Sequence, residues 1–247
     1  MKKVLSISLG SSSRDKKVKT TILNDDFIIE RKGTDGDKKK AAKLFKNLDG
    51  KYDAFGLGGM DLYIFANGQR YTFRDAKKII KNVSKTPVVD GSGLKNTLER
   101  KTLFYLQNEN NMIFADRNVL LVSALDRFGM AETLVNMGAD VFFGDLIFGL
   151  NLPILMKRMK SLELLVKIAA PVITRLPFEL FYPTGDKQLE TSTKQSFSRY
   201  YHQADIIAGD IHFIKKHLPE NLEGKYIITN SVTETDIKKL KECNIAN

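Results

Sequence analysis

The chain has 247 residues, of which 43% are hydrophobic and 28% are charged, and 39 Lys and Arg against 29 Asp and Glu give a net charge of +10. This balance is typical of a globular protein with a substantial core and excludes an intrinsically disordered chain. The single cysteine, Cys243, excludes an intramolecular disulfide and a thiolate metal cluster. Because Met1-Lys2-Lys3 leads directly into a strand-like segment, we expect no secretion signal and a cytoplasmic location.

The first half alternates strands and helices, with several turns rich in glycine and polar residues. We expect strands at 4–9, 18–23, 27–31, 52–57 and 87–90, a hairpin at 67–68, and helices at 37–48 and 74–83. The helix at 37–48 has Ala41, Leu44, Phe45 and Leu48 on one apolar face. The pattern predicts an N-terminal mixed α/β domain over residues 1–112.

The second half follows a more regular strand and helix alternation. We expect strands at 118–124, 139–144, 205–209 and 226–230, and helices at 130–137, 213–218 and 233–241. Such alternation implies a parallel sheet covered on both faces. The chain is therefore predicted to be α/β, with a Rossmann-like parallel-sheet domain over residues 113–247 that carries an apolar insertion at about 152–200.

The apolar stretch at 152–182 carries too many charges to cross a bilayer, so we predict no integral membrane segment. Packing against the sheet or against a second subunit is the favoured interpretation, which makes a homo-oligomer through this stretch the expected assembly. Contact with a membrane surface is the less favoured alternative.

The positive charge includes a local cluster of Lys38, Lys39, Lys40, Lys43 and Lys46. At helical spacing these lysines indicate a solvated outer face, and no basic-aromatic motif accompanies them, so we expect no nucleic-acid partner. The histidines are His202, His212 and His217, and no set of ligands at metal-binding spacing surrounds them, so we expect no metal site.

Residues 118–145 have the arrangement of a nucleotide site. A buried strand ends in a turn, and the amide groups at the start of the next helix can meet a diphosphate. Asp145 lies 21 residues beyond Ala124, near the separation expected for an acid that binds a ribose, which favours NAD over NADP. The alternative is that Asp145 only ends a strand, since any parallel sheet contains such a unit.

A family resemblance covers residues 86 to 145. The segment Asp90-Gly91-Ser92-Gly93-Leu94, followed by the strand Asn118 to Ala124 and by Gly138-Ala139-Asp140, resembles the shikimate and quinate dehydrogenases. The resemblance implies an oxidoreductase that acts on a small hydroxylated acid with a nicotinamide cofactor. It also implies that Asp90 is the polar partner of the substrate hydroxyl. Lys95 lies five residues further on and is our candidate for the base.

The candidate site residues fall into three groups. The predicted catalytic residues are Asp90 and Lys95. The predicted cofactor-binding residues are Ser123, Ala124, Arg127, Gly129 and Asp145. The predicted substrate-binding residues are Ser6, Ser8, Gly91 and Gly93, of which the two serines are similar to a Ser-x-Ser substrate contact of the same family.

Two alternatives remain open. The turn Ser123-Ala124-Leu125-Asp126 stands where the resembled family has a glycine-rich turn, which a non-catalytic ligand-binding protein with the same fold would explain. The small-residue turns Gly10-Ser11-Ser12-Ser13 and Gly58-Gly59 are similar to those of the acetate and sugar kinases, which cradle ATP phosphates. An ATP-dependent small-molecule kinase is therefore the other alternative.

Overall fold

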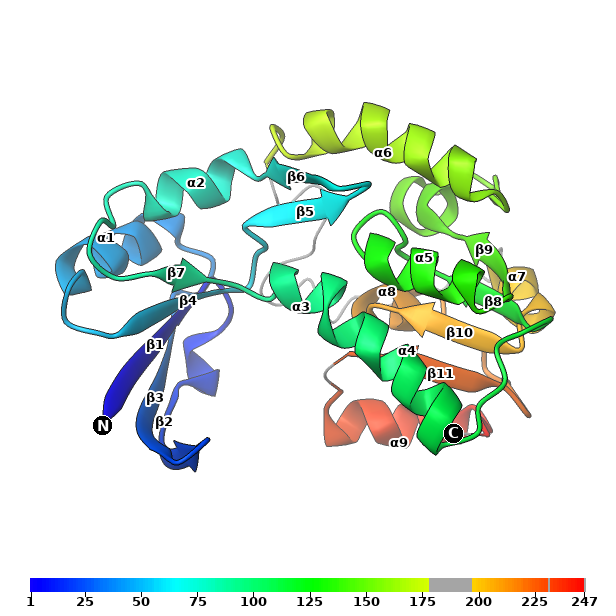
Figure 1. The fold of residues 1–247 in the computed structure, drawn as a ribbon, viewed down its shortest axis with the longest axis horizontal. Coiled ribbons are helices and arrows are strands. Elements are labelled where there is room, and N and C mark those ends of the chain that lie inside the picture. Colours follow the sequence, from blue (N-terminus) through cyan, green and yellow to red (C-terminus); the bar gives the residue numbers. More distant parts are fainter. Residues whose placement is uncertain (178–196, 231, 247) are drawn as a thin grey trace. The chain divides into compact units, whose positions relative to one another are not determined.

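The computed structural model describes residues 1–177, 197–230 and 232–246 (Figure 1). The chain divides into two compact units, each described by itself below. The first is built mainly from Met1–Ile64 and Arg70–Gly93, and the second begins its main segment at Leu94–Ile168 and includes the C-terminal part. The second unit thus begins within the residues that the sequence analysis assigns to the first domain.

The first unit is built on a five-stranded sheet with the order β2-β3-β1-β4-β7. Its strands are β1 (Lys2–Ser8), β2 (Lys16–Ile22), β3 (Asp25–Gly33), β4 (Ala54–Gly58) and β7 (Val88–Val89). All neighbouring pairs are parallel except β2 with β3, which are antiparallel. This is the mixed α/β architecture that the sequence predicts.

Two helices pack together in this unit, α1 (Lys38–Leu48) and α2 (Arg74–Ile80). Asp37 starts α1 by accepting hydrogen bonds from the backbone N–H groups of Lys39 and Lys40. The Phe45 ring of α1 lies 5.4 Å from the Phe55 ring of β4, and both side chains are fully buried. A short 3-10 helix, η1 (Ser12–Arg14), follows β1, and β5 (Tyr63–Ala66) and β6 (Gln69–Thr72) form a separate two-stranded sheet.

The second unit contains a four-stranded sheet with the order β11-β10-β8-β9. The strands are β8 (Asn118–Leu121), β9 (Asp140–Phe143), β10 (Ile206–Gly209) and β11 (Tyr226–Thr229), and every neighbouring pair is parallel. The central strands are almost wholly apolar and buried, as parallel strands covered on both faces must be. The Rossmann-like fold class is therefore confirmed.

The remaining helices lie before, between and after these strands along the chain, and two of them include residues of both units. They are α3 (Ser92–Asn96), α4 (Leu98–Glu109), α5 (Phe128–Asn136), the π-helix η2 (Asp145–Gly149), α6 (Met159–Ile173), α7 (Ser198–Gln203), α8 (Ile211–Lys216) and α9 (Glu234–Glu242). Helix α4 packs on α5, and α5 packs on β9. A second aromatic group forms around Phe148 of η2, whose ring lies 5.6 Å from Tyr201 and 6.2 Å from Phe197.

Of the described α-helices, α3, α4, α6 and α7 are absent from the sequence prediction. The two longest of these are α4, over residues 98–109, and α6, over residues 159–173 within the predicted apolar insertion. The rest of the insertion from 178 to 196 lies outside the described residues. Among the helices of the described ranges, none combines the length and the apolar character that crossing a bilayer requires.

Candidate functional site

The parallel sheet of the second unit has a point at which its connections diverge. From β8 the chain runs through α5 to β9 on one side, and from β10 it runs through α8 to β11 on the other. Because β8 and β10 are neighbours, their carboxyl ends flank a topological switch point. Ligands of open α/β sheets bind at such points, so the residues that follow β8 and β10 make up the candidate site.

The turn after β8 is closed by Asp145. Residues 121–130 are all buried. The Asp145 carboxylate accepts a hydrogen bond from the Leu125 N–H at 2.7 Å and one from the Ala124 N–H at 3.2 Å. Burial raises the pKa of Asp145 to about 7, even though the two N–H groups favour the ionised form. The acid predicted to bind a ribose is thus bonded to the turn predicted to bind a diphosphate.

Arg127 has the least exposed charged side chain among the ion pairs at the switch point. Its side chain is only 2% exposed, and it donates through Nη1 to the Glu99 carboxylate and through Nη2 to Asp210 Oδ2 at 3.1 Å. Asp210 directly follows β10 and caps α8 by accepting from the His212 N–H. Burial acts to raise the pKa of Asp210, but the Arg127 charge, the His212 N–H and the charges of His212 and Lys95 together hold the pKa below its ordinary value.

A second ion pair runs beside the first. The Nζ of Lys95, in α3, lies 2.6 Å from Asp126 Oδ2. The side chain of Asp126 is only 6% exposed. Lys95 and Glu99 are four residues apart, and they pair with the consecutive residues Asp126 and Arg127. The segment that holds α3 and α4 is therefore tied to the turn after β8 by two charge pairs.

Several buried polar atoms at this point have no hydrogen-bond partner among the described residues. They are Ser123 Oγ, Glu99 Oε2 and Arg127 Nε. Gly209 has a φ of 128°, and a Cβ there would lie 2.7 Å from Val122 Cγ2 and 3.3 Å from Ser123 Oγ, so glycine permits the close approach of β10 to Ser123. An unpaired buried polar group costs about 1–3 kcal/mol, which a bound polar ligand or water would recover.

The predicted cofactor-binding residues lie together. Ser123, Ala124, Arg127 and Gly129 follow β8 in one continuous segment, and Asp145 is bonded to that segment. Gly129 lies in α5, where a Cβ would meet Arg100 Nε at 2.8 Å and Asn96 Oδ1 at 2.9 Å. Lys95, predicted to be catalytic, reaches the same turn through Asp126.

The other predicted residues belong to the first unit. Asp90 follows β7, and its Oδ2 accepts from the Leu62 N–H at 2.6 Å and from the Ser92 hydroxyl. Ser6 and Ser8 lie on β1, and Ser8 Oγ accepts from the Gly10 N–H and from Arg31 Nη2, each at 3.1 Å. Gly91 and Gly93 flank Ser92, and the roles of all these residues remain predictions.

The small-residue turn on which the kinase alternative rests follows β1. Ser11 caps η1, and the Ser12 N–H donates to Asp35 Oδ1 at 2.6 Å. No group of three or more His, Cys, Asp or Glu residues that could hold a metal ion occurs in the part of the chain that the structure describes.

Sequence reasoning missed the roles of Glu99, Asp210 and Asn230. Asn230 follows β11 and donates through Nδ2 to Asp210 Oδ2 at 3.0 Å. The available signal was position, because Asp210 directly follows a predicted strand and Asn230 ends one, at the edge where ligands bind. Glu99 lies on a helix that the sequence did not reveal.

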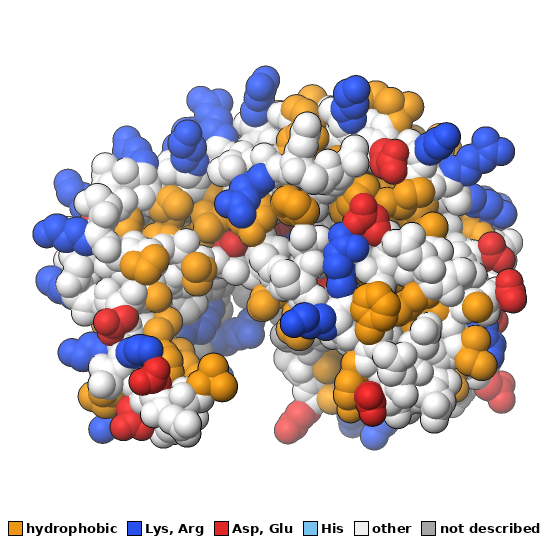
Figure 2. Space-filling model, in the orientation of Figure 1, with side chains coloured by type: hydrophobic (Ala, Val, Ile, Leu, Met, Phe, Trp, Pro, Cys, Tyr) orange, Lys and Arg blue, Asp and Glu red, His pale blue; other side chains and the backbone are white. Residues whose placement is uncertain are grey.

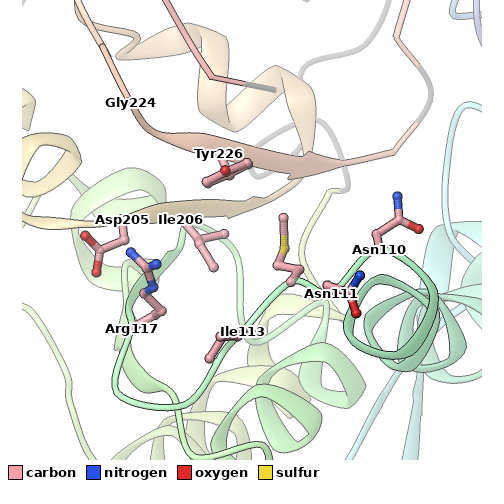
Figure 3. A pocket seen from close by; sticks show the side chains of 9 residues that line it. Asn110, Asn111, Ile113, Arg117, Asp205, Ile206, Gly224 and Tyr226 are labelled. Carbon is pink, nitrogen blue, oxygen red and sulfur yellow. The ribbon is translucent and has the colours of Figure 1, made fainter.

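A small cavity of about 170 Å³ lies at the opposite, amino end of the same sheet (Figure 3). Asp205, Ile206 and Tyr226, at the starts of β10 and β11, line it together with Arg117 and the loop after α4. The Asp205 carboxylate accepts from the Asn118 N–H at 2.9 Å, which ties it to the start of β8. This cavity lies at the edge away from the switch point and is separate from the candidate site.

Comparison with known proteins places the chain in a family. Residues 93–247 match the family model described as "Domain of unknown function (DUF8754)", and residues 3–90 match one described as "Domain of unknown function (DUF8753)". Since the first match covers more than half of the chain, the protein belongs to the DUF8754 family. No curated protein matches the chain.

The chain is also similar to several solved structures at low identity. A glutamate dehydrogenase matches with a TM-score of 0.41 and 11% identity, over 88% of this chain and 53% of its own. An ornithine carbamoyltransferase from Pyrococcus furiosus matches with a TM-score of 0.41 and 10% identity, over 94% and 73%. A phosphoglycerate oxidoreductase from Vibrio cholerae o395 matches with a TM-score of 0.33 and 7% identity, over 99% and 81%. The chain spans about half the length of the glutamate dehydrogenase, and these likenesses carry no argument about activity.

Proposed function

We propose that this protein is a nicotinamide-dependent oxidoreductase of the quinate and shikimate dehydrogenase type, acting on a small hydroxylated acid. The observation that carries the proposal is the turn after β8, which lies at the switch point of a parallel sheet and directs two backbone N–H groups at one carboxylate, that of Asp145. Convergent N–H groups at the start of a helix are the usual receptor for a diphosphate.

The fit of NAD to this turn depends on Asp145. Its carboxylate occupies the Ala124 and Leu125 N–H groups as a ligand anion would, so it stands in for the diphosphate. Because burial raises the pKa of Asp145 to about 7, its ionised form is disfavoured at this turn, and protonation near neutral pH weakens its hold on the two N–H groups. Ser123 Oγ, buried and without a partner among the described residues, is a further donor for the ligand.

The proposed roles follow from these positions. NAD supplies hydride transfer at its nicotinamide. Residues 123–129 bind the diphosphate, and Asp145, released from the turn, accepts the ribose hydroxyls. Lys95 is the proposed base, held by Asp126 at 2.6 Å, and Asp90 is the proposed partner of the substrate hydroxyl. Ser6, Ser8, Gly91 and Gly93 are proposed substrate contacts.

The test is cofactor binding by calorimetry, followed by absorbance at the nicotinamide band with quinate and shikimate as probes. Asp145→Asn should shift the preference from NAD toward NADP, because a carboxylate at the ribose repels a 2′-phosphate. Asp140→Asn, at the exposed start of β9, is the matched control and should leave this preference unchanged. A folded wild-type protein that binds neither dinucleotide would refute the proposal.

A non-catalytic ligand-binding protein with the same fold is the second candidate. The observation that favours it is the complete burial of residues 121–130, with two of the turn's N–H groups satisfied from within the chain. It predicts that small hydroxy acids raise the melting temperature while NAD and NADP do not. The calorimetric titration separates the two candidates directly.

A further inference from the structure

Helix α6 has apolar side chains on two opposite faces. Leu162, Val166 and Ala170, spaced four residues apart, are fully buried and anchor the helix. A second set at the same spacing, Leu164, Ile168 and Val172, is 58%, 62% and 55% exposed. Residues two positions apart point in nearly opposite directions on a helix with 3.6 residues per turn. The second set therefore forms one line, here called the exposed stripe, on the side away from the anchoring face.

The exposed stripe contributes little to the fold. Single exposed apolar side chains are normal on protein surfaces, but one on each of three successive turns makes a continuous ridge about 12 Å long. Continuous exposed apolar surface marks a site of interaction. A polar side chain at each of these positions would be compatible with the same helix.

Basic side chains lie along one side of the exposed stripe and before the start of the helix. Arg158, Lys160 and Lys167 are all exposed, and none forms a salt bridge with any residue that the structure describes. Glu163 is the one acidic residue in the sequence of α6. Figure 2 shows Lys and Arg side chains beside hydrophobic ones along the surface of this helix. Such a combination of an apolar line with unpaired cations is typical of helices that lie in a lipid interface.

The positive charge beside the exposed stripe favours one of two binding partners. A second copy of the chain would bring two sets of Arg158, Lys160 and Lys167 together around the same contact, and like charges repel. An anionic lipid surface presents the opposite charge together with apolar acyl chains at the depth of the stripe. We propose that α6 docks the protein on the surface of an anionic bilayer through the exposed stripe, without crossing it.

The test is flotation of the full chain with lipid vesicles. We expect binding to vesicles of equal phosphatidylcholine and phosphatidylglycerol, release by high salt, and no binding to phosphatidylcholine alone. The double variant Leu164→Gln, Ile168→Gln should abolish binding. Lys160→Gln and Lys167→Gln should each weaken it about fivefold, the effect of one cation near an anionic surface.

Matched controls separate this surface from general charge and hydrophobicity. Ile113→Gln removes an equally exposed apolar side chain, 66% exposed, from outside α6. Lys238→Gln removes an exposed lysine of α9. Both variants should bind vesicles like the wild type. Unchanged circular dichroism and melting temperature establish that the variants fold.

Two outcomes would overturn the proposal. The first is no binding of the wild-type protein to anionic vesicles. The second is a dimer in sedimentation equilibrium that Leu164→Gln, Ile168→Gln dissociates, in which case a second copy covers the stripe. Neither outcome depends on whether the protein binds NAD.

Discussion

Removal of the buried guanidinium at the switch point gives the sharpest test of what holds the candidate site together. Arg127 is 2% exposed and bridges Glu99 and Asp210, whose side chains are 16% and 22% exposed. Arg127→Met keeps most of the side-chain length but removes the guanidinium that pairs with both carboxylates in a poorly solvated place. Breaking a buried ion pair by removing one partner costs about 3–5 kcal/mol, so we expect the free energy of unfolding to fall by that amount.

The assay is urea unfolding followed by circular dichroism at several pH values. Without Arg127, the largest effect that lowers the pKa of Asp210 is lost, while burial, the largest effect of all, remains, so we expect its folded-state pKa to rise above the ordinary 3.8. A raised carboxyl pKa makes the folded protein less stable as pH increases, so the deficit of Arg127→Met should grow with pH. Adding Asp210→Asn to the variant should recover part of the loss because it removes one uncompensated charge.

Arg100→Met is the matched control. Arg100 pairs with Glu132 near the surface, where the two side chains are 28% and 37% exposed, and such pairs contribute at most about 1 kcal/mol. A cost for Arg127→Met no larger than that of Arg100→Met, with no dependence on pH, would refute the view that this ion-pair network secures the turn after β8.

Three further predictions concern single residues. Because burial raises the folded-state pKa of Asp145 to about 7, stability should fall as pH rises between about 4 and 7, and Asp145→Asn should flatten that fall in melting curves; an unaltered pH profile contradicts it. Asp90→Asn should stay close to the wild type in stability and lose substrate binding or turnover, whereas a variant that loses the roughly 0.5–2 kcal/mol of a helix cap yet keeps full turnover assigns Asp90 a structural role. Gly33→Ala should destabilise the protein by about 1–3 kcal/mol in urea unfolding, because its Cβ would lie 2.6 Å from the backbone of Ser11; Gly149→Ala, with nothing within 4 Å of its Cβ, is the control that should cost less.

The sequence predicts the central strands of both sheets because their burial is encoded locally. The strand β8 reads as an unbroken apolar run, and its residues from Val119 to Leu121 are fully buried. Helix α1 has a single apolar face, and Ala41 and Phe45 on that face are the buried ones. Where one face of an element is apolar, periodicity and burial carry the same information.

The two longest helices that the sequence does not predict, α4 and α6, each lack a single apolar face that matches their buried residues. Helix α4 buries Leu103 alone among its residues, whereas Phe104 and Tyr105 are 51% and 60% exposed, so no apolar face appears in its sequence. Helix α6 is apolar over a wide arc that includes both its buried and its exposed positions, so its sequence does not separate the buried face from the exposed one. Periodicity identifies a buried face only where apolar residues are confined to it.

The contacts of the candidate site cannot be predicted from local sequence for a different reason. Arg127 meets Asp210 across 83 residues and Glu99 across 28 residues, and only the completed sheet brings these positions together. Strand ends can be predicted, and with them the edge at which polar residues gather. The pairing among those residues depends on side-chain direction, which the spacing along the chain does not encode.

The spacing between Ala124 and Asp145 in the sequence does not determine which group Asp145 binds. Its distance from Ala124 correctly places an acid at the end of the strand next to β8, but a carboxylate there can reach either a ribose or the turn itself. In a glycine-rich turn the backbone lies open to a ligand, whereas here Leu125 and Asp126 bury the turn and leave its N–H groups in need of an internal acceptor. Asp145 satisfies two of them at the cost of a buried charge, which is why its pKa is raised. A ligand anion at this turn must therefore displace Asp145, and its affinity should rise as pH falls through about 7, because protonation weakens the carboxylate that competes with it.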